Sequence, residues 1–143
     1  EVQAACLLAQ LEREAEIRQS RLHAWHRYQH AMTEALSGSG VRWPQPLPDC
    51  QHNGHLFYAC VSAELRPALL NHLRQRGIEA AAHYTALHLS TAGQHYGRFH
   101  GPDPVTRLAA VGLLRLPLWS GMERDQLTAI IDAVTGFFRH AHC

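Results

Sequence analysis

The chain has 143 residues, of which 46% are hydrophobic, and this composition fits a single globular domain with a core of its own. The formal net charge of +1 argues against a polyanion-binding surface, and no apolar run reaches the length that spans a membrane. We therefore expect neither nucleic acid nor membrane among its partners.

Residues 2–36 form a pattern typical of one long helix, with apolar residues at three- and four-residue steps (Leu8, Leu11, Ala15, Leu22, Trp25, Met32 and Leu36). Arg18 interrupts this stripe and predicts a bend near residues 18–20. Such a helix would be roughly 50 Å long, which is longer than a domain of this size is wide. It is either a plain amphipathic helix or one whose first turns pack on another domain or subunit. In the second case residues 2–11 would expose apolar surface in the isolated chain.

The rest of the chain predicts an α+β domain over residues 38–143, preceded by a linking helix over residues 1–37. The expected strands are His55–Ser62, Ile78–Ala82 and Leu113–Leu118, the last broken near Pro117. The expected helices run from Ser62 or Ala63 to Gly77, from Asp103 as cap to about Gly112, and from Met122 to Arg139. The strand–helix–strand order implies a small sheet with helices packed on one face.

Polar aromatic residues gather directly after the second expected strand. His83, Tyr84 and His88 follow its end, where a rigid scaffold usually presents binding groups. Imidazole and phenol groups suit sugar hydroxyls and phosphate oxygens, although these side chains could also simply pack or face solvent. Ser90 predicts either a phosphate-binding helix start or a plain N-cap. Arg98 and Arg115 could pair with a phosphate or carboxylate, or bridge to a nearby acid or carbonyl.

The twelve histidines and four cysteines do not predict a specific metal site. His26 and His30 alone have helical zinc spacing, and no third ligand accompanies them. The tail with His140, His142 and Cys143 could hold metal adventitiously. The cysteines never form a CxxC pair, which indicates reduced thiols in a cytoplasmic protein.

The segment HYTALHLSTAGQHYGRFHG at residues 83–101, followed by LLRLPLWSGM at residues 113–122, resembles the DegT/DnrJ/EryC1/StrS family of sugar-nucleotide aminotransferases. The resemblance covers the whole chain and corresponds to the last third of such enzymes. It implies the small C-terminal α+β domain, with a small, mainly antiparallel sheet, of a fold-type I enzyme that uses pyridoxal phosphate and forms homodimers. The chain also opens on Glu1, without methionine and already in a helical pattern, and so we expect it to be part of a longer protein.

The likeness is greatest to members that transfer an amino group, from glutamate, to the 4-keto carbon of a dTDP-4-keto-6-deoxyhexose in surface polysaccharide synthesis. It implies that His83, Tyr84 and His88 lie near the cofactor or the sugar nucleotide. The family commonly has proline where this chain has Ala86 and Thr91, and these departures loosen the loop but leave the polar groups in place.

The chain contains no lysine, and all thirteen basic residues are arginine. Pyridoxal phosphate enzymes hold their cofactor as a Schiff base on a lysine amine, which a protonated guanidinium cannot replace. We therefore expect this chain alone to be inactive and to bind no cofactor. The alternative is a stand-alone ligand-binding or protein-interaction module.

Overall fold

The computed structural model describes residues 1–141, with side chains up to residue 139. Its N-terminal part is two helices, α1 (Val2–Glu12) and α2 (Glu14–Leu36), separated at Arg13. The expected bend near residues 18–20 is therefore wrong in position. Arg13 has the non-helical dihedrals φ −110 and ψ 16, whereas Arg18 lies inside α2, with its guanidinium 3.0 Å from the Glu14 carboxylate on the exposed surface.

The sheet has three strands, in the order β1-β3-β2, and both pairings are antiparallel. The strands are β1 (Phe57–Cys60), β2 (Ala81–Ala82) and β3 (Leu113–Leu116). β3 is the last in sequence but lies in the centre, with Phe57 opposite Leu116 and Ala82 opposite Leu114. The prediction of a small antiparallel sheet in an α+β fold is confirmed, as is the end of the third strand before Pro117.

The first two strands are shorter than the sequence pattern predicted. In the second, Ile78 donates its backbone N–H to Leu73 O at 3.0 Å, and Ala80 donates to Ile78 O at 3.1 Å. These turn hydrogen bonds close the preceding helix and leave only Ala81 and Ala82 to pair with β3. β1 begins two residues later than predicted, at Phe57, which pairs with Leu116, the last residue of β3. The next residue, Pro117, has no backbone N–H to extend the pairing.

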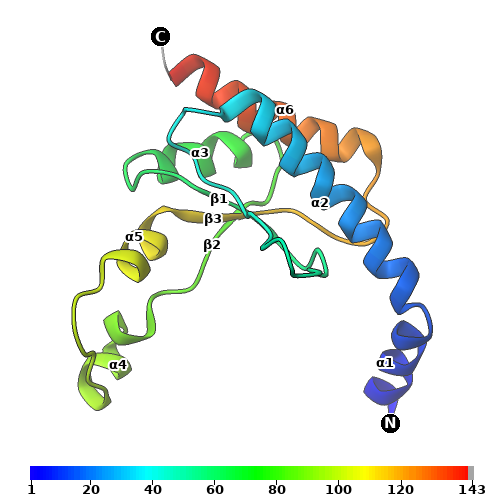
Figure 1. The fold of residues 1–143 in the computed structure, drawn as a ribbon, viewed down its shortest axis with the longest axis horizontal. Coiled ribbons are helices and arrows are strands. Elements are labelled where there is room, and N and C mark those ends of the chain that lie inside the picture. The colour runs from blue at the N-terminus through cyan, green and yellow to red at the C-terminus, as the bar shows by residue number, and fades with distance from the viewer. Residues whose placement is uncertain (142–143) are drawn as a thin grey trace.

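Three helices cover one face of the sheet, as predicted, and Figure 1 shows them on the same side of the strands: α2, α3 (Leu65–Arg74) and α6 (Arg124–Ala141). α6 packs on both α2 and α3. α3 and α6 begin two or more residues later than predicted. The core between helices and sheet contains fully buried side chains from every one of these elements (Tyr28, Met32, Phe57, Leu69, Leu73, Leu114, Leu127 and Val134).

Two segments extend away from this core (Figure 1). One is α1, which has no buried residue. The other, which we call the arm, is residues 83–112; it contains the 3-10 turn η1 (Leu87–Leu89), α4 (Thr91–Tyr96) and α5 (Pro104–Gly112). Within residues 1–141, no helix is both long enough and apolar enough to pass through a membrane.

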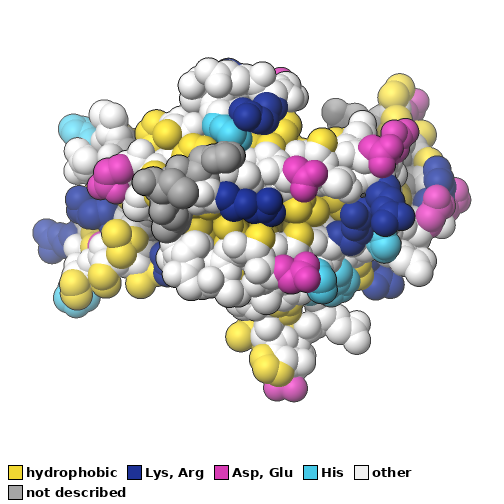
Figure 2. Space-filling model, turned by 90° about the horizontal axis from the view of Figure 1, so that it is seen from above, with side chains coloured by type: hydrophobic (Ala, Val, Ile, Leu, Met, Phe, Trp, Pro, Cys, Tyr) yellow, Lys and Arg dark blue, Asp and Glu magenta, His cyan; other side chains and the backbone are white. Residues whose placement is uncertain are grey.

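Both extended segments expose hydrophobic side chains. In α1 these are Val2, Leu7, Leu8 and Leu11, with exposed fractions from 56% to 79%. This confirms the expectation that residues 2–11 carry an exposed apolar surface in the isolated chain. In the arm they include Tyr84, Leu87, Tyr96, Val105 and Leu108, and Figure 2 shows hydrophobic side chains at the end of the molecule where the arm lies.

Candidate functional site

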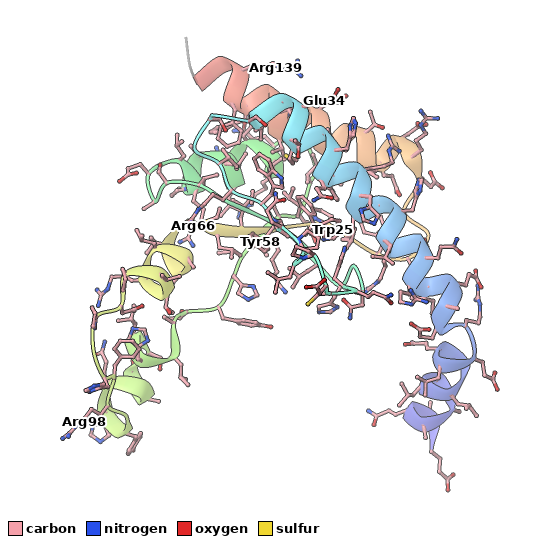
Figure 3. The ribbon with its side chains drawn as sticks, viewed as in Figure 1. Trp25, Glu34, Tyr58, Arg66, Arg98 and Arg139 are labelled. Carbon is pink, nitrogen blue, oxygen red and sulfur yellow. The ribbon has the colours of Figure 1, made fainter. Side chains whose placement is uncertain are left out.

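The face of the sheet opposite the helices carries polar side chains. Tyr58 of β1 is paired directly with Arg115 of β3, and Arg115 is paired in turn with Ala81 of β2. Side chains of directly paired residues lie on the same face of a sheet, so the Tyr58 ring and the Arg115 guanidinium share this face. Both residues are half-buried, and Figure 3 shows Tyr58 at the sheet, below the covering helices.

His83 and Tyr84 follow β2 directly, and the structure brings them together at the start of the arm. Their ring centroids are 4.7 Å apart. Tyr84 is 75% exposed, and the guanidinium carbon of Arg115 lies 5.7 Å from the centroid of its ring, within range of a cation–π interaction. His83 is half-buried, and its Nδ1 atom is buried without a hydrogen-bond partner. A buried imidazole nitrogen without a partner is unusual and identifies His83 as a candidate binding group.

His88 lies inside the arm, where it makes two contacts. Its Nε2 is 2.6 Å from an Oδ atom of Asp103, and its ring stacks on Phe99 with a centroid distance of 4.2 Å. Burial alone would raise the pKa of Asp103, but hydrogen bonds from the His88 ring, from the backbone N–H of Arg107 and from the side chain of Thr106 hold that pKa below its ordinary value. The contact between His88 and Asp103 thus joins η1 to the start of α5.

Two helix caps and one close backbone approach fix the shape of the arm. The hydroxyl of Ser90 accepts a hydrogen bond from the N–H of Gly93 at 3.0 Å, which confirms the N-cap interpretation of Ser90. The carboxylate of Asp103 caps α5, as predicted. A side chain at Gly93 would place its Cβ 1.8 Å from the carbonyl oxygen of Leu87, so η1 and α4 can only pack this closely around glycine. The arm is joined to the body where Arg66 donates to Ala110 O at 2.7 Å.

Arg98 and Arg115, whose roles the sequence left open, lie in different parts of the molecule. Arg98 is exposed at the tip of the arm, far from the sheet (Figure 3). Neither Arg98 nor Arg115 forms a hydrogen bond or ion pair with any residue that the structure describes, so the expected bridge to an acid or carbonyl is absent at both.

The structure also places two residues beside Arg115 that sequence reasoning did not single out. Arg21 of α2 and His55, just before β1, line the same cavity as Arg115. No sequence signal could have found this set, because its members are separated by 34 and 60 positions and come from three different segments.

Histidines, cysteines and acids form no group of three suited to a metal ion within the described part of the chain. His26 has an imidazole neighbour, His52, at a centroid distance of 5.8 Å. Cys6, Cys50 and Cys60 are free thiols. The tail with His140, His142 and Cys143 lies outside the described side chains.

The fold is that of known aminotransferase structures. The chain has a TM-score of 0.84 and 30% identity with DesV of S. venezuelae, over 95% of this chain and 36% of that one. With the aminotransferase TlmJ of Streptoalloteichus hindustanus the TM-score is 0.77 and the identity 27%, over 94% of this chain and 35% of that one. With a DegT DnrJ EryC1 StrS aminotransferase of Brucella abortus the TM-score is 0.83 and the identity 26%, over 96% of this chain and 35% of that one.

Residues 1–135 match the DegT/DnrJ/EryC1/StrS aminotransferase family, and the chain belongs to that family. It spans about a third of the length of the solved structures that it matches. The resemblance inferred from the sequence is thus confirmed at the level of the family.

Proposed function

We propose that this chain is the C-terminal part of a pyridoxal-phosphate-dependent sugar-nucleotide aminotransferase. The longer protein transfers an amino group, from glutamate, to the 4-keto carbon of a dTDP-4-keto-6-deoxyhexose in the cytoplasm, for surface polysaccharide or lipopolysaccharide synthesis. The product we propose is dTDP-4-amino-4,6-dideoxygalactose. The proposal is supported by the family match over residues 1–135 and by the share of each solved aminotransferase that the chain covers.

The observation that carries the role of this chain is the placement of His83 and Tyr84. Both residues follow β2 directly, beside the polar face of the sheet that lies opposite the described helices α2, α3 and α6. His83 has a buried nitrogen without a described partner, and Tyr84 has an exposed phenol. They can donate to and accept from sugar hydroxyls and phosphate oxygens. His88 acts with them from within the arm, where its contact with the Asp103 carboxylate holds it in place. These residues form one wall of the substrate site, and their share of catalysis is to bind and orient the sugar nucleotide.

The chain itself does not fit the cofactor. Pyridoxal phosphate acts as an electron sink once it is attached to a lysine amine, and no lysine exists in this sequence. The attaching lysine must therefore belong to another part of the longer protein. We expect the isolated chain, mixed with pyridoxal phosphate, to give no stable Schiff-base absorbance band and to convert no keto-sugar nucleotide. A stoichiometric band or turnover would contradict this.

The substrate role is tested in the longer protein that contains this chain. His83→Ala and Tyr84→Phe should each raise KM for the sugar nucleotide about tenfold, the effect of losing one useful hydrogen bond, with little change in KM for glutamate. His95→Ala is the matched control, because His95 is an exposed arm histidine whose ring packs on that of its neighbour Tyr96. If His95→Ala has the same effect as His83→Ala, the assignment of the substrate wall is wrong.

The association of the longer protein as a homodimer is a further part of this proposal. It is supported by the exposed apolar residues of α1 and of the arm, because contiguous apolar surface of this kind usually meets a partner. Sedimentation of the longer protein as a strict monomer at high concentration would contradict it.

A further inference from the structure

A cavity of about 290 Å³ lies where β1 begins and β3 ends. Arg115 of β3, Arg21 of α2 and His55 line it, together with Glu79 and the apolar side chains of Pro117 and Leu118. The cavity thus brings two guanidinium groups and an imidazole from separate segments to one place, against an apolar wall.

Neither arginine has an acidic partner. The Nε atoms of Arg115 and Arg21 are both buried, and neither has a hydrogen-bond acceptor among the described residues. Arg115 contacts the ring of Tyr84 and makes no other polar contact with a residue that the structure describes. Arg21 makes one long contact, 3.5 Å from its Nη1 to Nδ1 of His55. Glu79 lines the same cavity, but it forms no ion pair with either guanidinium. A buried donor that has lost water without gaining an acceptor is unfavourable and calls for an explanation.

The charges around the cavity favour an anion. Both guanidinium groups remain protonated at every relevant pH, so two positive charges face one unpaired carboxylate. The His55 imidazole lines the same cavity and has a ring nitrogen that can serve as a third hydrogen-bond donor. The planar edge of a guanidinium can donate two parallel hydrogen bonds to a carboxylate or phosphate. No acidic side chain among the described residues forms this pair with Arg115 or Arg21. Both arginines are half-buried residues, so a small ligand in the cavity can reach them.

We propose that Arg115 and Arg21, with His55, form a binding site for a small oxyanion, a carboxylate or a phosphate group. The site adjoins the substrate wall, because Arg115 also lies over the ring of Tyr84. The inference goes beyond the proposed aminotransferase function and does not depend on it, since it concerns binding by this chain alone.

The test is a titration of the chain with inorganic phosphate and, separately, with glutarate, at constant ionic strength. The readout is the NMR signal of each arginine Nε–H group. We expect saturable shifts at Arg115 and Arg21 and none at Arg98, which has no partner and lies at the tip of the arm (Figure 3). A response to phosphate alone, to glutarate alone or to both supports the site and identifies the oxyanion class that it takes.

Variants separate a built site from general attraction to positive charge. Arg115→Gln and Arg21→Gln should each weaken the affinity at least about tenfold, whereas Arg98→Gln, with the same change of net charge, should leave it unchanged. Circular dichroism checks that each variant is folded, and should one fail to fold, the other and the wild-type shifts still decide the matter. The proposal is overturned if neither oxyanion gives saturable shifts at these two arginines, or if Arg98→Gln weakens binding as much as Arg115→Gln.

Discussion

Replacement of Tyr28 by phenylalanine tests how α2 is joined to the sheet. Tyr28 is fully buried, its ring stacks on Phe57 with a centroid distance of 4.9 Å, and its hydroxyl donates to the carbonyl oxygen of Pro117 at 2.8 Å. The substitution keeps the ring and its packing but removes the donor. It leaves the carbonyl at the end of β3 without its partner.

The expected loss follows from that one hydrogen bond. Removing one partner of a buried pair costs about 1–3 kcal/mol of unfolding free energy. For a chain of this length each kcal/mol lowers Tm by roughly 3–4 °C. The measurement is urea unfolding followed by tryptophan fluorescence. Tyr58→Phe is the matched control, because the Tyr58 hydroxyl has no hydrogen-bond partner in the described structure, and it should change the unfolding free energy by less than about 0.5 kcal/mol.

The pH dependence of the same variant provides a second check. Burial raises the pKa of Tyr28 above its ordinary value of 10.0. A raised pKa in the folded state means that the stabilisation is complete below pH 10 and is lost as pH rises further. The advantage of the wild type over Tyr28→Phe should therefore shrink in alkaline solution. Equal stabilities of Tyr28→Phe and Tyr58→Phe at neutral pH would refute the reasoning.

Three further substitutions test the arm and α6. Gly93→Ala should destabilise η1 and α4, because the alanine Cβ would lie 1.8 Å from the backbone carbonyl oxygen of Leu87. Gly136→Ala should raise the unfolding free energy by up to about 1 kcal/mol, because Gly136 lies inside α6 with open space around it. Amide hydrogen exchange in each helix measures both effects, and protection of α4 in Gly93→Ala equal to that of the wild type would be contrary to expectation. The pKa of Asp103 is lowered in the folded chain, so the Asp103 carboxylate stabilises the arm at pH values above the ordinary carboxyl pKa. This stabilisation is lost as the pH falls through the lower pKa that Asp103 has in the folded chain. In the wild type, amides at the start of α5 should therefore lose protection from hydrogen exchange in acid. In Asp103→Asn these amides should be less protected already at neutral pH, and their protection should depend less on pH. Identical pH profiles of protection in the two proteins would exclude this role of Asp103.

Much of the fold could be predicted from local pattern. The periodic apolar residues of α2 and α6, the cap at Asp103 and the end of the third strand before Pro117 are properties of short stretches, and the structure contains each of them. The family resemblance likewise depended on contiguous motifs at residues 83–101 and 113–122. The break at Arg13 could not be read in the same way. Arg18 is the more conspicuous interruption of the apolar stripe, yet α2 continues through it and its side chain lies on the exposed surface beside Glu14.

The sequence by itself determined that this is an α+β chain with a polar aromatic segment after its second strand, because helix periodicity, strand length and capping are set by neighbouring residues. Only the tertiary structure decided that β3 lies in the centre of the sheet, that His88 pairs with Asp103, and that Arg21 and His55 share a cavity with Arg115. These are contacts between residues that are distant along the chain. They depend on which strands pair and which helix packs against them, and no short stretch of sequence carries that information.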